Sequence, residues 1–224
     1  MFSSDRGGSK GERTRALIRE TALRSFRERG YDETTVRLIA TEAGVSLGST
    51  NYHFPSKNHL VQELYLEVTG ELRRTAIDRM SDESALTARL RIAFQAGLEV
   101  LEPYHRFAPG FVSAAVSPRS PINPLSGESE PALQEVVAVF RAAVEGARRG
   151  VPDEIADALP EALTIAYLLL ALFWTYDRSP GQRRTRLLLE RALGLLQVAL
   201  PLTRLPALRR PVHELFELVA EVRS

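Results

Sequence analysis

The chain has 224 residues, of which 44% are hydrophobic, so it can bury one large core or two modest ones. It contains no cysteine, which excludes disulfide frameworks, thiolate metal sites and cysteine nucleophiles. The net charge of +1 is unevenly spread, because residues 1–57 carry ten basic and seven acidic side chains and are therefore +3, against −2 for the remainder. A basic N-terminal part suits a phosphate-binding module, although a solvated helix face would have the same charge.

The composition favours an all-α protein, because aromatic residues make up only 7% of the chain and strand-forming runs are scarce. The longest apolar stretch, Ala162–Trp174, is interrupted only by Thr164 and is shorter than the roughly 20 residues that span a bilayer. We therefore expect a buried helix there and no membrane partner. The first fifteen residues lack the apolar core of a secretory signal, so a cytoplasmic location is expected.

The N-terminal part is expected to form a flexible arm and then short helices. Residues 1–11 are rich in Gly, Ser and charge, which is typical of an arm. A helix is predicted over 12–29, where apolar residues recur four positions apart, and Gly30 is placed to end it. Thr35 is a suitable N-cap for a second helix over 36–43.

Two further helix starts follow. Gly44 breaks the second helix, and Ser46 can cap a short third helix that runs to Phe54. A proline stops that helix. Ser56 can then cap a fourth helix, which is predicted to run to Met80.

The rest of the chain is also expected to be helical. Pro160 either kinks one helix or marks a fresh start, because proline lacks the amide donor. The Pro, Ser and Gly residues between Ser117 and Pro131 predict a mobile loop. Ser179 and Gln182 have the spacing of a capping box at the start of a later helix. The predicted helices span residues 84–102, 105–116, 131–149, 153–177, 181–200 and 211–222.

The segment from Thr35 to Leu60 predicts a helix-turn-helix. Two short helices are joined by a turn that contains Gly44, and Ala40 is small where the helices must approach closely. The second helix presents polar and aromatic groups that suit base edges and phosphates, and helix starts supply backbone amides for phosphates. We expect Tyr52 to contact phosphate rather than the core. The predicted DNA-contacting residues are Thr35, Ser46, Leu47, Gly48, Ser49, Thr50, Asn51, Tyr52, His53 and Lys57.

This segment resembles the DNA-binding domain of the tetracycline-repressor (TetR) family, by motif over about residues 12–62. Three departures from the family pattern are Ser25, where a large aliphatic residue is usual, Asn51 and His59. Ser25 suggests looser packing. The matching residues are Ile18, Ala22, Phe26, Gly30, Tyr31, Thr35, Val36, Ile39, Ala40, Ala43, Gly44, Val45, Ser46, Gly48, Tyr52, His53, Phe54, Ser56, Lys57 and Leu60.

The resemblance implies a helix-turn-helix domain over 12–58 and an all-helical ligand-binding and dimerisation domain over 59–224. It further implies a homodimer that binds a palindromic operator in double-stranded DNA and regulates transcription. The third helix of each copy would be the recognition helix. A small-molecule effector would shift the fourth helix, change the separation of the two recognition helices and release the DNA. Repression is expected, with activation left open. No cofactor and no metal are implied.

Within the helical domain, two sets of residues are predicted. A largely apolar effector would contact aromatic and aliphatic side chains, although each of these alone also suits a core. Leucine-rich helices over 160–177 and 181–200 favour a dimer interface over an oversized monomer core. The pocket set is Phe94, Leu98, Phe107, Phe111, Phe140, Tyr167, Leu170 and Trp174. The interface set is Leu168, Leu172, Leu189, Leu193 and Leu196.

Two functions other than transcription regulation are less consistent with the sequence. An enzyme is disfavoured, because no nucleophilic triad, metal cluster or phosphate-binding glycine loop can be assembled from the sequence. An interaction module that has lost DNA binding is disfavoured by the intact helix-turn-helix motif.

Overall fold

The computed structural model describes residues 9–117, 119–148, 151 and 153–202, and within these ranges the regular structure is helical, with no strand. Unit 1 comprises the described residues up to Tyr65 together with Pro103–Ser129. Unit 2 comprises Leu66–Glu102 together with the described residues from Glu130 onward. The all-α prediction is therefore confirmed for the part of the chain that the structure describes.

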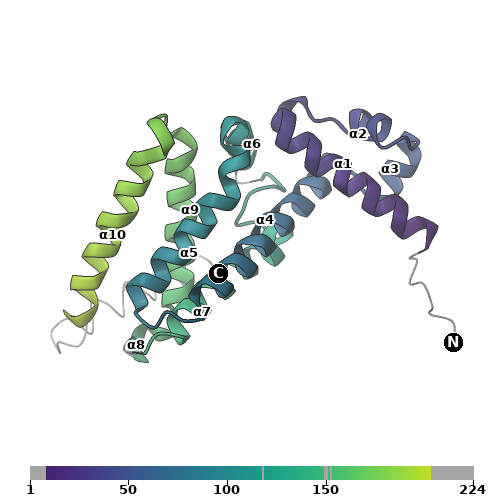
Figure 1. Ribbon diagram of the computed structural model, residues 1–224. Coiled ribbons are helices and arrows are strands. Elements are labelled where there is room, and N and C mark those ends of the chain that lie inside the picture. The colour runs from purple at the N-terminus through teal and green to yellow at the C-terminus, as the bar shows by residue number, and fades with distance from the viewer. Residues whose placement is uncertain (1–8, 118, 149–150, 152, 203–224) are drawn as a thin grey trace, which may run out of the picture. The chain divides into compact units, whose positions relative to one another are not determined.

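Unit 1 is built on α1, with α2 and α3 packed beside it (Figure 1). Its 3₁₀ segments and α6 follow later in the chain, and α6 also packs against α1. The elements are α1 (Lys10–Glu33), α2 (Val36–Glu42), α3 (Leu47–His53), the first turns of α4 (Lys57–Met80), η1 (Glu102–Phe107), α6 (Ala108–Ala115) and η2 (Gly127–Ser129).

Unit 2 is a helical bundle in which α7 packs on α5 and α9, and α10 packs on the same two helices. Figure 1 shows α5, α9 and α10 side by side. Besides the rest of α4, the elements are α5 (Leu86–Leu101), α7 (Glu130–Glu145), α8 (Asp153–Ala156), α9 (Leu159–Tyr176), η3 (Pro180–Gln182) and α10 (Arg183–Leu202).

The first helix begins two residues earlier than predicted. The Ser9 hydroxyl accepts a hydrogen bond from the Glu12 backbone N–H at 3.2 Å, and the Glu12 carboxylate accepts one from the Ser9 N–H. This capping box satisfies two backbone donors at the start of α1. Residues 1–8 of the expected flexible arm lie outside the described residues.

Gly30, the residue predicted to end the first helix, leaves helical geometry, but α1 continues beyond it to Glu33. Its φ of 79° and ψ of −170° are accessible to glycine and strained for other residues. A Cβ atom at this position would lie 2.7 Å from both Cβ and Cδ1 of Phe107. Both the backbone conformation and the approach of Phe107 therefore require glycine here.

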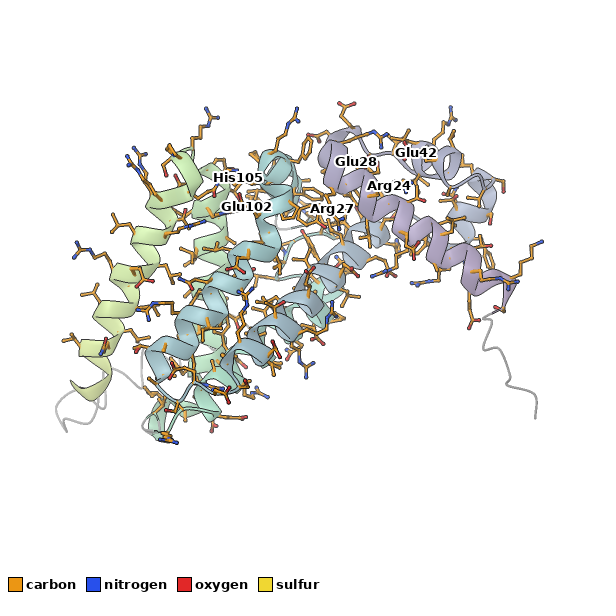
Figure 2. All side chains as sticks on the ribbon, viewed as in Figure 1. Arg24, Arg27, Glu28, Glu42, Glu102 and His105 are labelled. Atoms are coloured by element: carbon orange, nitrogen blue, oxygen red, sulfur yellow. The ribbon has the colours of Figure 1, made fainter. Side chains whose placement is uncertain are left out.

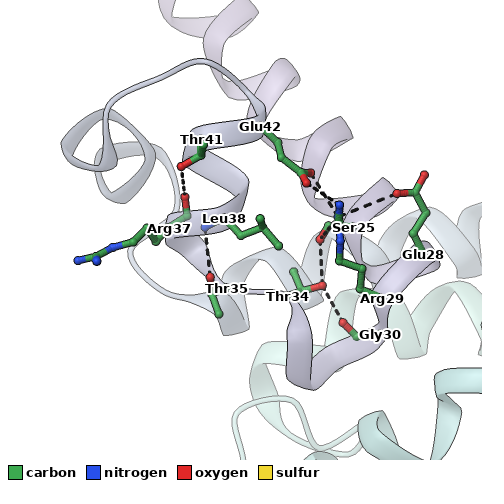
Figure 3. Close-up of polar contacts among 10 residues, drawn as sticks. All are labelled: Ser25, Glu28, Arg29, Gly30, Thr34, Thr35, Arg37, Leu38, Thr41 and Glu42. Carbon is green, nitrogen blue, oxygen red and sulfur yellow. Dashed lines mark hydrogen bonds and ion pairs between the residues drawn. The ribbon is translucent and has the colours of Figure 1, made fainter.

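Ser25 does not loosen the packing of α1, contrary to the sequence interpretation. It is fully buried, and its hydroxyl lies 3.1 Å from the Thr34 hydroxyl (Figure 3). The Thr34 hydroxyl donates its single hydrogen to the Gly30 carbonyl at 2.7 Å. The Ser25 hydroxyl must therefore be the donor in its hydrogen bond with Thr34. Arg29 Nη1 donates to Ser25 Oγ at 3.3 Å. Hydrogen bonds thus replace the apolar contacts that an aliphatic residue would make.

The segment predicted as a mobile loop, Ser117–Pro131, packs in unit 1 in its described part. The Ile122 side chain is 1% exposed, and the Ile122 carbonyl accepts a hydrogen bond from the Tyr65 hydroxyl at 2.9 Å. Gln62 Nε2 donates to the Pro121 carbonyl at 2.8 Å and to Ser129 Oγ at 3.0 Å. Two side chains of α4 therefore fix this segment, although it forms only one short 3₁₀ turn.

Replacing Ile122 by alanine should lower the free energy of unfolding by roughly 3 kcal/mol, because a fully buried aliphatic side chain is lost and a cavity remains. Urea unfolding of the purified variant measures this change. The matched control is Leu125→Ala in the same segment, where the side chain is 56% exposed and the expected cost is below about 0.5 kcal/mol. Equal effects of the two substitutions would show that the segment is not packed as described.

The domain boundary expected at residue 58 differs from the division into compact units. The segment Pro103–Ser129 falls within the predicted ligand domain, 59–224, but belongs to unit 1. The physical reason is aromatic packing on α1. Phe111 makes an edge contact with Phe26, with ring centroids 5.6 Å apart, and Phe107 lies against Gly30.

The connections of unit 2 show what Pro160 does and correct the capping box predicted for Ser179 and Gln182. Pro160 marks a fresh start, because α8 ends at Ala156 and α9 begins at Leu159. Gln182 is not a capping-box partner of Ser179, since no side-chain cap is formed there. The helix predicted over 211–222 lies outside the described residues.

Asp177 caps the start of α10 instead. Its carboxylate accepts hydrogen bonds from the Ser179 N–H at 2.9 Å and hydroxyl at 2.6 Å, and from the N–H and hydroxyl of Thr185, both at 2.8 Å. Burial alone would raise the pKa of the Asp177 carboxyl, but these hydrogen bonds lower it below its usual value. The turn between α9 and α10 is therefore organised around one buried carboxylate.

Arg89 is a buried cation that bonds to carbonyl groups. Nη1 donates to the Met80 and Glu83 carbonyls at 2.7 and 2.6 Å, Nη2 to Ala142 at 2.8 Å, and Nε to Ala143 at 3.0 Å. These acceptors include the last carbonyl of α4, that of Met80, and two late carbonyls of α7, where the helix dipole is negative. Arg89 thereby joins the C-terminal ends of two helices.

One described helix, Leu159–Tyr176, is long and apolar enough by length and composition alone to cross a membrane. In unit 2 it packs on α5, α7 and α10, with 44% of that window buried. A core helix passes the same test, so this observation is weak evidence for a membrane span.

Candidate nucleic-acid interface and effector region

The turn between α2 and α3 has the geometry that the sequence predicts. Gly44 adopts a φ of 65°, and the N–H groups of Gly44 and Val45 donate to the carbonyls of Thr41 and Ala40 at 3.1 and 3.0 Å. Thr35 and Ser46 cap the two helices, since each side-chain oxygen accepts a backbone N–H at 3.1 Å. Both helices of the predicted helix-turn-helix are therefore fixed by local hydrogen bonds.

Most of the predicted DNA-contacting residues lie on the surface of unit 1. Tyr52 is 83% exposed, and its ring makes an edge contact with His53, with centroids 5.1 Å apart. Phe54 is buried, as expected for a core residue. The exposed residues of the set are Thr35, Ser46, Leu47, Gly48, Asn51 and Tyr52, and the half-buried ones are Ser49, His53 and Lys57.

Thr50 was wrongly included in that set. Its side chain is fully buried, and its hydroxyl donates to the Ser46 carbonyl at 3.2 Å. A helix turns by about 100° per residue, so Thr50, three residues after the exposed Leu47 and two after the exposed Gly48, lies on the side of α3 that faces the core. It supports the helix and is not available to DNA.

Lys57 lies over an aromatic ring. Its Nζ is 3.7 Å from the centroid of Tyr31, which is cation–π geometry. Burial lowers the pKa of the Lys57 ammonium, and the neighbouring Asp32 carboxylate acts in the opposite direction. The side chain is thus held in one place at the first residue of α4.

Arg37 is an exposed basic residue that the predicted contact set omitted. It lies in the first turn of α2, two residues after the N-cap Thr35. Figure 3 shows its guanidinium directed away from the ion pair of Arg29 with Glu42, where Nη2 lies 2.7 Å from Oε1. A basic residue close to a predicted N-cap was the signal that could have identified it.

Part of the positive charge of the N-terminal region is neutralised by ion pairs. Arg19 Nε lies 2.9 Å from Glu63 Oε2, and Arg15 pairs with the same carboxylate. Figure 2 shows acidic residues of α1 and α2, including Glu28 and Glu42, beside the arginines of this unit. The excess charge of residues 1–57 is therefore only partly available to phosphates.

The predicted effector set does not gather in one place. Phe107 and Phe111 pack in unit 1, as described above. In unit 2, Phe94, Phe140 and Tyr167 form an aromatic cluster with centroids 4.8 to 6.4 Å apart. All three rings are buried, and Leu170 is buried as well. These side chains are packed core, so the prediction that they line a pocket is not supported by the geometry.

Leu98 and Trp174 do line a cavity of about 500 Å³ in unit 2, formed by α5, the first residue of η1, α9, η3 and α10. This volume is within the range of small-molecule sites. The polar part of its wall could not be predicted from the sequence, because these residues come from helix faces that carry no recognisable motif. The remaining lining residues are Gln95, Glu99, Glu102, Gln182, Thr185, Arg186, Leu189 and Glu190.

The predicted interface set contains two errors. Leu189 and Leu193 are 4% and 3% exposed, because this face of α10 packs within unit 2. Leu172 is exposed, and Leu168 and Leu196 are half-buried. An exposed apolar face nevertheless runs along α9 and α10. We call it the α9–α10 face, and its residues are Leu169, Leu172, Phe173, Tyr176, Leu187, Leu188, Leu195 and Val198.

Metal-ligating side chains do not cluster in the described ranges, where no group of three or more His, Asp or Glu residues is suitably placed.

Comparison with known families gives a match to both parts of the chain. A sequence model described as "Bacterial regulatory proteins, tetR family" matches residues 18–64, and one described as "Tetracyclin repressor-like, C-terminal domain" matches residues 89–219. The second match alone covers more than half of the chain. The chain therefore belongs to the TetR family, whose members are DNA-binding transcription regulators and not enzymes.

Two curated relatives match less than half of the chain. The HTH-type transcriptional repressor KstR2 of Mycobacterium tuberculosis is 35% identical over 101 residues, which is 45% of this chain and 50% of that protein. The HTH-type transcriptional regulator BetI of Escherichia coli is 33% identical over 85 residues, 38% of this chain and 43% of that protein. The chain thus spans about half the length of the curated relatives it matches.

Solved structures share the fold over most of the chain. A TetR transcriptional regulator from Nitrosomonas europaea has a TM-score of 0.59 at 20% identity and covers 82% of this chain and 97% of its own. A tetR-family transcriptional regulator from Streptomyces coelicolor has a TM-score of 0.62 at 17% identity, with 96% and 90% covered. At these identities the likeness concerns the fold alone.

Proposed function

We propose that the protein is a cytoplasmic, homodimeric repressor that binds a palindromic operator and is released from it by a small, largely apolar effector. The observation that carries this proposal is the capped helix-turn-helix, in which α3 exposes Leu47, Asn51 and Tyr52 while Phe54 is buried. Exposed polar and aromatic groups on such a helix suit phosphate and base contacts in the major groove. The relative KstR2, named a repressor, supports the direction of regulation.

The α9–α10 face supports the dimer. Large apolar side chains that are exposed together on two adjacent helices indicate a protein interface. This face contains a shallow hollow of about 490 Å³, which is lined by Leu169, Leu172, Phe173, Tyr176, Asp177 and Arg184. A two-fold axis through the face would pair it with the same face of a second copy, and would present two recognition helices to two half-sites.

The cavity lined by Leu98 and Trp174 is the candidate effector site. Leu98, Trp174 and Leu189 form the apolar part of its wall, and the other lining residues, such as Gln95 and Glu102, are polar or charged and can bind the polar end of the ligand. An effector releases DNA only if it binds more tightly to the conformation that binds DNA poorly. The continuous helix α4, which contributes residues to both units, is the element through which such a change would pass.

The deciding experiment is selection of bound sequences from random duplex DNA at physiological salt with the purified full-length chain. Enrichment of one inverted repeat is the expected result. Binding that lacks sequence preference and falls steeply with salt would leave only the charge argument standing. If a folded protein bound no DNA at low salt, the proposal would be wrong, and an interaction module would be the better description.

Replacing Tyr52 by alanine should weaken binding to the selected operator about tenfold, or ~1.4 kcal/mol, because an exposed aromatic contact on α3 is lost. Fluorescence titration with labelled operator measures the affinity. Thr50→Val on the same helix is the matched control, since its hydroxyl is buried and its loss should leave affinity within about twofold. An unchanged affinity of the Tyr52→Ala protein would remove this surface from the DNA interface.

A further inference from the structure

We propose that Tyr31 is a positioning residue for DNA binding, which holds the Lys57 ammonium in place for a phosphate and is itself set by Phe111 of α6. This inference rests on the proposed function, because it takes Lys57 to contact DNA. All the residues concerned belong to unit 1.

The first step is the placement of Lys57. Its Nζ lies 3.7 Å from the centre of the Tyr31 ring, so the ammonium faces the electron-rich side of the ring. Asp32, the next residue after Tyr31, acts electrostatically on the same ammonium. The lysine is only half-buried, and an ammonium that rests on a ring keeps N–H groups directed away from it. These donors are available to a phosphate oxygen.

Holding Lys57 in place reduces the entropy that its side chain loses when it binds a phosphate. A free lysine side chain has large rotamer entropy, which is lost when the ammonium binds a phosphate. A side chain that is already held loses less on binding, and preorganisation of this kind increases affinity. Lys57 is also the first residue of α4, a 24-residue helix, where the backbone dipole favours an anion. The held ammonium and the helix start therefore act on the same region.

The third step links Tyr31 to α6. The rings of Tyr31 and Phe111 have centroids 5.7 Å apart at an angle of 60°, and Phe111 in turn contacts Phe26 of α1. A Cβ atom at Gly110 would lie 3.0 Å from Asp32 Oδ2, so α6 approaches the Tyr31–Asp32 pair closely. A displacement of α6 would consequently move the ring on which Lys57 rests.

The test is a double-mutant cycle on the full-length protein with the selected operator. Tyr31→Leu retains an apolar side chain and removes the ring face, whereas Tyr31→Phe retains the ring and is the matched control. We expect Tyr31→Leu to weaken binding about fivefold and Tyr31→Phe to leave it within about twofold. Lys57→Met should weaken binding at least as much as Tyr31→Leu and should reduce the salt slope by about one. Adding Tyr31→Leu to Lys57→Met should cost nothing more.

A spectroscopic measurement accompanies the cycle. The ε-methylene protons of Lys57 should be shifted upfield by the ring in the parent and in Tyr31→Phe, with the signal assigned by its absence in Lys57→Met. This measurement decides the geometry even if Tyr31→Leu does not fold, because an unshifted signal in the parent would overturn the proposal.

The remaining outcomes separate the inference from the proposed function. Parent-like or tighter binding by folded Tyr31→Leu, while Lys57→Met binds weakly, would overturn the positioning role and leave the regulator intact. Additive losses in the double variant would show that Tyr31 acts through packing alone. If Lys57→Met bound like the parent, the inference would fail, and the proposed function would still be judged by the sequence selection and by Tyr52→Ala.

Discussion

Replacing Leu195 by arginine should convert the protein to monomers and weaken operator binding by at least about 100-fold. Leu195 is 73% exposed and lies on the α9–α10 face beside other large apolar side chains. A charge placed without a partner in an apolar interface costs several kcal/mol, and in a symmetric dimer the change occurs twice. A monomer engages one half-site instead of two, so the loss of dimerisation is magnified in operator affinity. Sedimentation equilibrium and operator titration measure the two effects.

The control for this substitution is Ile77→Arg. Ile77 is an exposed apolar residue of α4 in unit 2, 43% accessible, and it lies outside the α9–α10 face. Its replacement adds the same charge and should leave both the dimer and operator binding within about twofold of the parent. A Leu195→Arg protein that remains dimeric would mean that the two copies associate through another surface.

Replacing Gly30 by alanine should lower the free energy of unfolding by about 3 kcal/mol or more. Alanine at a φ of 79° and ψ of −170° is strained, which costs on the order of 1–3 kcal/mol. The added methyl would also lie 2.7 Å from Phe107 Cβ, an atom close to the backbone that cannot turn away as the tip of a long side chain can. Urea unfolding followed by circular dichroism measures the change.

Gly44→Ala separates these two causes. Gly44 also has a positive φ, 65°, but no heavy atom lies within 4 Å of the position that a Cβ would occupy. The substitution should therefore cost only about 1 kcal/mol, the strain of the left-handed conformation. If Gly30→Ala cost no more than Gly44→Ala, the contact with Phe107 would contribute nothing measurable.

Features with a local cause could be predicted from the sequence. Gly30 and Gly44 break helices where the chain needs a positive φ. Thr35 and Ser46 cap α2 and α3, because each side-chain oxygen accepts a hydrogen bond from the backbone N–H three residues later. The capping box of Ser9 and Glu12 has the same character and was visible in the spacing of these residues. The predicted start of α1 was wrong only because this signal was assigned to the flexible arm.

Features that depend on packing between distant segments could not be predicted. Leucines occur on nearly every face of α9 and α10, so their spacing does not distinguish the exposed side of Leu195 from the buried side of Leu189. Composition identified the segment from Ser117 as irregular, but irregular is not the same as unpacked, and Ile122 fixes it to α4. An inventory of aromatic residues likewise could not assign Phe107 to unit 1 and Phe94 to unit 2.

The guanidinium of Arg89 has a mechanical consequence for α4. One of its hydrogen bonds goes to the Met80 carbonyl, the last of this helix, and two go to carbonyls of α7, so sliding α4 along its axis would break a hydrogen bond to a buried charge. A tilt about this held end would keep the Met80 carbonyl near the guanidinium. In a rigid helix of 24 residues, roughly 35 Å long, the displacement produced by a tilt grows with distance from the pivot. If α4 tilted about Met80, Lys57 at the opposite end of the helix would therefore move farthest.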